Sequence, residues 1–213
     1  KGGVTGGTWG NGIIAGQVQI SDNKNTTFTF FDLTEPIETA DGTSKTLESI
    51  GASCFNGNKV IEEVILPDTV KFIGQQAFNN CTSLHNIGRF PNQMRSVGGG
   101  TFNGCTALTN EIALPETLKS TTWNTFANTQ ISGDIVWPKN AGAVQVLDFQ
   151  NTKITSFVVQ EGGNCKSIWR HAFQGCSSLT NVVLAEGIGT LGSLNADQGH
   201  VFDGCTQLKQ INF

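Results

Sequence analysis

The sequence is poor in several residue types, and these shortages narrow its possible functions. It contains no tyrosine, so its aromatic content rests mainly on 14 phenylalanines, and it has only one methionine. Only 14% of the residues are charged, and the formal net charge is −4. Because there is no basic excess to displace counterions from phosphates, we exclude nucleic acid as the expected partner.

Long apolar stretches are also missing. No apolar run approaches the length of a bilayer-spanning helix, so we expect no transmembrane span. The first residues, Lys1-Gly2-Gly3, lack the apolar core of a signal peptide. For an exported protein, the signal has therefore been removed or lies outside this sequence.

Sequence motifs for catalysis and for metal binding are lacking as well. No Cys-x-x-Cys spacing is present, which argues against a zinc site. There is no Gly-x-Ser-x-Gly and no recognisable nucleophile with a positioned base. The glycines at 98–100 lack the lysine and helix that follow a phosphate-binding loop. We expect no enzymatic activity, no cofactor and no metal.

A repeat organises the chain. Phenylalanine recurs at intervals of 23, 24, 24, 23, 24 and 29 residues, within the range of about 20–29 residues of leucine-rich repeats. The anchors are Phe55, Phe78, Phe102, Phe126, Phe149, Phe173 and Phe202.

Other positions keep the same register. An apolar residue followed by glycine precedes several anchors, as in Ile73-Gly74. Cysteine follows three residues after four of the anchors and threonine after two others, and leucine follows six residues after four of them. A short alternating segment then ends in proline, as in residues 64–67. The cysteines and threonines are Cys81, Cys105, Thr129, Thr152, Cys176 and Cys205.

A unit this short cannot bury its own apolar face, so neighbouring units must stack around one continuous core. Each coil contributes a short strand that ends at proline, which has no amide donor. The Ala-Phe-x-x-Cys segment is too short for an independent helix, and we expect one helical or 3₁₀ turn there. The sequence therefore predicts a right-handed, β-rich leucine-rich-repeat solenoid of about seven coils over residues 46–213.

Residues 73–90 and 168–184 follow the pattern Ile-Gly-x-x-Ala-Phe-x-x-Cys-x-x-Leu-x-x-Ile-x-Leu-Pro closely. This pattern resembles the BspA-like leucine-rich repeats of bacterial surface proteins, and the resemblance extends over residues 46–213. It weakens at 126–131 and 149–154, where the cysteine and leucine positions change. The resemblance implies an extracellular or cell-surface protein. Some relatives are adhesins for host matrix or plasma proteins, and the family carries no catalytic residues.

Both ends of the chain depart from the repeat. Residues 13–20 and 27–30 alternate around a turn at 22–25, which predicts an N-terminal β-hairpin within residues 1–45. It would cap the first coil or be the remnant of a linker. Extra residues within 193–200 predict a surface loop. The segment 208–213 ends as a strand, which leaves a sheet edge open to self-association or a longer array beyond it.

The cysteines and histidines have both a structural and a functional interpretation. Four cysteines share one core-facing repeat position, and Cys54 and Cys165 occupy apolar positions of other coils. We therefore favour buried thiols over disulfides and over a metal site. His171 and His200 both lie two residues before an anchor and could approach each other, with Asp203 nearby. They form either a weak metal or proton-switch site or two exposed polar residues.

The outward positions of the strands give the candidate binding residues. Aligned on the strand ends, one row reads Ile65, Arg89, Ala113, Val136, Val158, Val183 and Asn212. Two positions earlier, the row reads Glu63, Ile87, Glu111, Asp134, Ser156, Asn181 and Gln210. Because the second coil has an extra residue, the register of its members is open. Strand propensity alone accounts for the valines, whereas an exposed apolar strip would mark a binding face.

Three functional hypotheses follow. The first is a secreted or surface-anchored, adhesin-like module that binds an extracellular protein or glycan, such as a host matrix or plasma protein. The second is a structural, self-associating spacer of the cell envelope. The third is an enzyme, which the repeat disfavours because stacked coils provide surfaces rather than enclosed polar clefts.

Overall fold

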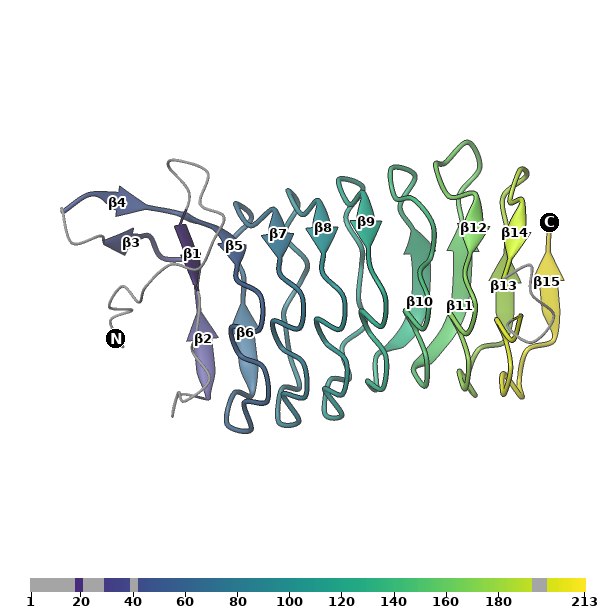
Figure 1. The fold of residues 1–213 in the computed structure, drawn as a ribbon, viewed down its shortest axis with the longest axis horizontal. Helices are drawn as coiled ribbons and strands as arrows, with labels where there is room; N and C mark the ends of the chain where they lie inside the picture. The colour runs from purple at the N-terminus through teal and green to yellow at the C-terminus, as the bar shows by residue number, and fades with distance from the viewer. Residues whose placement is uncertain (1–17, 21–28, 39–41, 193–198) are drawn as a thin grey trace.

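The computed structural model describes residues 18–20, 29–38, 42–192 and 199–213. The chain winds into a parallel β-solenoid in which coil after coil is stacked along one axis (Figure 1). Two layers of short strands run along opposite sides of the stack, with the strand directions reversed between them (Figure 1). Each repeat therefore supplies a segment to both layers, whereas the sequence predicted one strand per coil.

The first layer, here called the short-strand layer, is parallel throughout and consists of strands of two to four residues. It continues across an isolated bridge between Val144 and Ile168 into its last two strands. In spatial order it contains β1 (Val18–Ile20), β5 (Leu47–Ile50), β7 (Phe72–Ile73), β8 (Ser96–Val97), β9 (Ser120–Thr121), β12 (Ser167–Ile168) and β14 (Thr190–Leu191).

The second layer, here called the long-strand layer, contains the segments that the sequence predicted as strands. It starts with a parallel pair and ends with a four-stranded parallel sheet. Isolated bridges at Glu63–Asn86 and Glu111–Ser132 lie between the two. Its strands are β2 (Phe30–Asp32), β6 (Glu63–Ile65), β10 (Ser132–Trp137), β11 (Lys153–Val159), β13 (Asn181–Val183) and β15 (Gln210–Asn212).

The anchor phenylalanines form the centre of the core. Consecutive rings stack with centroids 5.0–5.8 Å apart and planes within 19° of each other, from Phe55 to Phe202. Six such stacks join seven anchors, which corresponds to about 6 turns of the solenoid. Rings at these distances interact favourably beyond their burial. The repeat register read from the sequence is confirmed.

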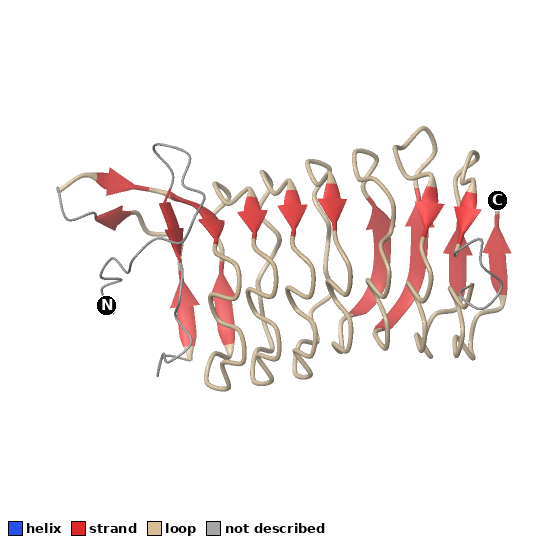
Figure 2. Ribbon diagram, in the orientation of Figure 1, coloured by secondary structure: helices blue, strands red, loops and turns tan. Residues whose placement is uncertain are grey.

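The expected helical or 3₁₀ turn at each anchor is wrong, because no helix occurs among the described residues (Figure 2). Two residues with positive φ lie around each of the first six anchors, for example Gln76 (55°) and Asn80 (56°) around Phe78. Left-handed residues interrupt a helix. Several amides here also bond to the next coil rather than along their own turn, as Phe78 N does to Thr101 O at 2.9 Å.

The N-terminal hairpin is present but is formed by other residues than expected. β3 (Ile37–Glu38) pairs antiparallel with β4 (Ser44–Lys45). The expected pairing of residues 13–20 with 27–30 is wrong where the structure describes them. β1 pairs in parallel with β5, and β2, which includes Phe30, pairs in parallel with β6. The division at residue 46 stays a prediction, and the expected loop at 193–200 falls largely outside the described residues.

Within the described part of the chain, no helix has the length and apolar character needed to cross a membrane.

Candidate interaction face

Three valines of the long-strand layer form a row across neighbouring strands. Val136 of β10 pairs with Val158 of β11, which pairs with Val183 of β13. We call Val136, Val158 and Val183 the valine strip. Asn212 of β15 continues the row beyond Val183. The sequence predicted this alignment from the strand ends, and the register agrees with it.

The valine strip faces outward because the strands alternate. The residues directly before the three valines, Ile135, Phe157 and Val182, are completely buried. Val136 is 50% exposed, whereas Val158 and Val183 are partly buried. This is the alternation expected for a sheet with one face on the core and one toward solvent.

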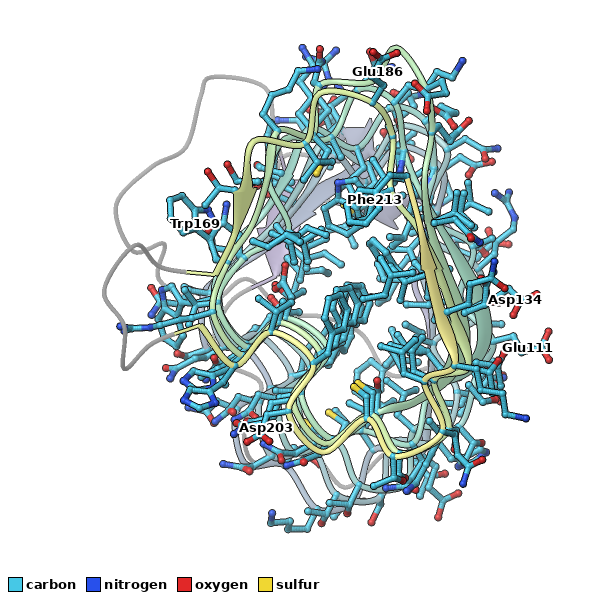
Figure 3. All side chains as sticks on the ribbon, turned by 90° about the vertical axis from the view of Figure 1, so that its right-hand side faces the viewer. Glu111, Asp134, Trp169, Glu186, Asp203 and Phe213 are labelled. Carbon is cyan, nitrogen blue, oxygen red and sulfur yellow. The ribbon has the colours of Figure 1, made fainter. Side chains whose placement is uncertain are left out.

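Acidic side chains lie before the strip on the same side of the molecule. Glu111 and Asp134 are both exposed and project from the long-strand layer (Figure 3). They are not directly paired, since Glu111 bridges to Ser132 and the register shifts between Gly133 and Asp134. The φ of Gly133 is +80°, and a Cβ there would lie 3.0 Å from Glu111 Cγ. This glycine therefore permits both the bulge and the position of Glu111.

The N-terminal members of the predicted rows are less exposed. Glu63 and Ile65 are both partly buried, and Glu63 Oε1 accepts a hydrogen bond from Asn86 Nδ2 at 2.5 Å. Asn86 Oδ1 in turn accepts one from Asn110 Nδ2 at 2.8 Å. Ala113 is exposed, one coil before Val136. The carboxylate of Glu63 thus already has a partner, whereas the exposed part of the face lies around Ala113, Asp134 and Val136.

The structure corrects the predicted positions of two residues in the outward rows. Ile87 does not face outward next to Glu63; it is buried, and Asn86 holds the outward position. Gly88, with φ 60°, accommodates the extra residue of this coil. Arg89 instead forms two hydrogen bonds with the Asp68 carboxylate, at 2.8 and 2.6 Å, which lowers the pKa of Asp68.

The cysteines are part of the core. All six carry thiols, five are buried, and Cys205 is partly buried. Cys81 Sγ donates to the Phe55 carbonyl of the preceding coil at 3.0 Å, and Cys105 Sγ donates to that of Phe78 at 3.0 Å. Burial raises the pKa of the Cys81 thiol to about 12. A thiol that stays protonated is a poor nucleophile and a poor metal ligand, so Cys81 packs rather than reacts.

His171 and His200 lie next to each other, as their repeat positions suggested. Their ring centroids are 5.7 Å apart and their planes differ by 1°. Nδ1 of His171 is buried and has no hydrogen-bond partner in the described part of the chain. No cluster of three or more His, Cys, Asp or Glu side chains is placed to hold a metal ion among the described residues.

Sequence reasoning missed a buried carboxylate. Asp148 is completely buried at the position before an anchor, where the other coils have alanine, threonine, cysteine or valine. Its oxygens accept hydrogen bonds from Thr121 Oγ1 at 2.5 Å, Gln145 N at 2.9 Å and Thr125 N at 3.2 Å. Burial raises its pKa to about 6, although these hydrogen bonds act in the opposite direction. The signal available was an aspartate at a core position of the repeat.

A stack of coils with parallel strands, repeated leucine, cysteine and phenylalanine positions and one continuous core defines a leucine-rich-repeat solenoid protein. Residues 27–146 and 143–213 match the sequence profile of the BspA type leucine rich repeat region (6 copies). The chain belongs to this BspA-type leucine-rich-repeat family.

Solved structures agree with the fold. The Treponema pallidum leucine rich repeat protein superimposes with a TM-score of 0.76 at 23% identity, over 93% of this chain and 86% of that one. A leucine-rich repeat protein from Bacteroides ovatus gives a TM-score of 0.51 at 18% identity, over 97% of this chain and 86% of that one. No match was found among proteins with curated descriptions.

Membership of this family suggests a protein-binding or surface module. Leucine-rich-repeat proteins are in general binding or structural modules rather than enzymes.

Proposed function

We propose that the protein is a secreted or surface-anchored, adhesin-like module that binds an extracellular protein or glycan through its long-strand layer. The observation that carries the proposal is the in-register valine strip with a half-exposed Val136. Apolar side chains that are contiguous and exposed on a sheet commonly mark a contact surface. The module carries out no catalysis and needs no cofactor.

The neighbouring acidic residues indicate the character of the partner. Glu111 and Asp134 are exposed beside the strip: Asp134 is two residues before Val136 on β10, and Glu111 is two residues before the exposed Ala113, one coil earlier. Charges at the rim of a binding surface mainly influence the rate of association and the choice of partner. A partner with an apolar centre and a basic edge fits this arrangement, as host matrix and plasma proteins can supply.

The test is a triple substitution of the strip, Val136→Lys, Val158→Lys and Val183→Lys. The purified protein is screened against immobilised matrix proteins, plasma proteins and glycans. We expect the variant to lose at least about tenfold in affinity for the partner found, since buried contacts at the centre of an interface carry most of its binding energy. Its circular dichroism spectrum is expected to stay unchanged, because the three side chains point away from the core.

The control adds the same charge elsewhere. Val60, Thr106 and Thr206 are exposed and lie outside both strand layers. Their combined replacement by lysine should leave binding to the same partner intact. Full binding by the strip variant would remove the strip from the proposed site. A screen without any partner, together with concentration-dependent light scattering, would instead favour a self-associating envelope spacer.

A further inference from the structure

The opposite side of the solenoid carries a row of basic residues. On the short-strand layer, Arg95 N bonds to Lys71 O at 2.8 Å, and Lys119 N bonds to Arg95 O at 2.8 Å. These three residues therefore occupy the same position in consecutive coils, about 5 Å apart along the solenoid. Lys166 lies just before β12, and its carbonyl accepts a hydrogen bond from Gly189 N of the next coil. We call Lys71, Arg95, Lys119 and Lys166 the basic row.

Acidic residues are missing from the segments that carry this row, although the exposed Glu116, Glu161 and Glu186 lie in the turns just before them. From the second coil onward, the segments that build this side contain no aspartate or glutamate. They are residues 69–76, 93–100, 117–124, 141–147, 164–171 and 188–192. Glu48, which contacts Lys71 at 3.3 Å, lies at the N-terminal end of the row. Arg95, Lys119 and Lys166 are exposed. In a chain with net charge −4, these segments thus carry positive charges only.

Two exposed tryptophans lie on the same side, after the strand positions of their coils. Trp123 is 45% exposed and Trp169 is 37% exposed. A Cβ on Gly99 would lie 2.8 Å from Trp123 Cε2, so the indole rests directly on the backbone of the preceding coil. Trp169 projects from the side of the solenoid opposite to Asp134 (Figure 3). The two tryptophans are two coils apart, which corresponds to about 10 Å along the axis.

Hydroxyl groups occupy the strip between the basic row and the tryptophans. Ser96 and Ser120 pair in register, and their hydroxyls hydrogen bond at 3.1 Å. Ser167 and Thr190 hold the corresponding positions of the last two strands and are likewise paired. Cations and hydroxyl groups therefore run in parallel along the axis, and two indole rings lie beside them.

We propose that the short-strand layer binds an anionic polysaccharide that lies along the solenoid axis. Lysine and arginine pair with carboxylate or sulfate groups, and arginine does so with two parallel hydrogen bonds. The indole rings pack against the apolar faces of sugar rings, and the serine and threonine hydroxyls exchange hydrogen bonds with sugar hydroxyls. This surface is distinct from the valine strip, so the two proposals succeed or fail independently.

A polysaccharide fits these rows better than an acidic protein or a nucleic acid. The basic row is one residue wide and follows the axis through Lys71, Arg95 and Lys119, with Gly142 at this position of the next coil and Lys166 in the coil after it. A narrow line of charges of this kind matches a thin chain. A folded acidic protein would bury a broader and more apolar patch. A nucleic acid would require more cations around the row to gain enough from counterion release.

The test uses heparin and polygalacturonate as sulfated and carboxylated probes, with dextran as the neutral chain and oligothymidylate as a non-glycan polyanion. Binding of the full chain is measured by calorimetry at low and at physiological salt. We expect saturable binding to at least one anionic glycan, weakened by salt because exposed charges are screened, and none to dextran. The variant Arg95→Gln, Lys119→Gln, Lys166→Gln should bind about tenfold or more weakly.

A matched variant, Lys59→Gln, Lys153→Gln, Lys209→Gln, loses the same charge from exposed positions outside the basic row and should bind like the original protein. Trp123→Ala with Trp169→Ala should weaken binding by about tenfold without altering its salt dependence. The proposal is overturned by equal losses in the two glutamine variants or by failure of the original protein to bind either anionic glycan. Binding to oligothymidylate as tight as to the glycans would also overturn it.

Discussion

At the scale of single residues, Asp148 makes the stability of the protein depend on pH. The carboxyl group is completely buried, and its pKa is about 6 in the folded protein, compared with about 3.9 in an unfolded chain. Between these values the folded state binds more protons than the unfolded state. Stability from this group is therefore fully present below about pH 4 and is lost as pH rises toward 6, by about 3 kcal/mol in total.

The substitution Asp148→Asn tests this linkage. Asparagine does not titrate, so the difference in unfolding free energy between the original protein and the variant should change by about 2–3 kcal/mol between pH 7 and pH 4. At the lower pH, the unfolding free energy of the original protein should rise relative to that of the variant. Urea unfolding followed by circular dichroism at a series of pH values measures this difference.

The variant also replaces one acceptor oxygen by an amide that faces backbone N–H groups of Gln145 or Thr125. That mismatch adds a cost of about 1–3 kcal/mol that does not depend on pH. Asp134→Asn, at an exposed aspartate of the long-strand layer, is the control for the loss of one carboxylate. A pH-independent difference between Asp148→Asn and the original protein would contradict the buried titration.

At the scale of the structural element, the turn around each anchor sets the path of the coil. The residue two positions before the anchor has positive φ in six consecutive coils. Glycine and asparagine adopt this conformation readily, whereas residues with a branched or bulky side chain pay a cost of about 1–2 kcal/mol. The residues at this position are Ser53, Gln76, Gly100, Asn124, Leu147 and His171.

Leu147, with φ 61°, is the least suitable residue in this series. Leu147→Asn should stabilise the protein by about 0.5–1 kcal/mol, because relief of the backbone cost exceeds the loss of partly buried apolar contact. The neighbouring change Val146→Asn is the control; Val146 is also partly buried but has no positive φ, so it should bring no gain. Thermal unfolding of the two variants, measured side by side, tests this prediction. An equal loss of stability in both variants would show that Leu147 is not strained.

The same elements show what the sequence could and could not predict. The phenylalanine stack, the cysteine positions and the valine strip were predictable because each depends on a side-chain type that recurs at a fixed offset. Ser96–Val97 and Ser120–Thr121 were missed as strands because two residues show no alternation. Because these strands were not predicted, the basic residues directly before them, such as Arg95 and Lys119, were not recognised as a row.

Pairing partners were harder to predict than strands. Residues 18–20 form a strand as the alternation suggested, but alternation carries no information on which strand lies alongside. In the second coil, one extra residue at Gly88 moved Ile87 from the outward row into the core. Asp148 could not be singled out because its partners Thr121 and Thr125 come from the preceding coil.

At the scale of the whole molecule, the two strand layers give the solenoid two unlike sides. Glu111 and Asp134 project from one side and Trp169 from the other (Figure 3). The valine strip belongs to the long-strand layer with Asp134, and the basic row runs along the short-strand layer. Both sides are built by stacking, so their length is set by the number of coils. Removal of one complete coil should shorten both sides by one position and leave the stack intact.

Deletion of residues 79–102 removes one coil and joins Phe78 to Asn103. The chain then continues as Asn103-Gly104-Cys105 in place of Asn79-Asn80-Cys81, so the repeat register is preserved. Because each coil contacts only its neighbours, we expect a folded protein that is shorter by about 5 Å in small-angle scattering. Its urea m-value should fall by about a tenth, in proportion to the surface lost.

Deletion of residues 79–90 removes half a coil, misplaces every later phenylalanine and should abolish the cooperative transition. Folding of both deletions, or of neither, would show that stacking in register is not what holds the molecule together.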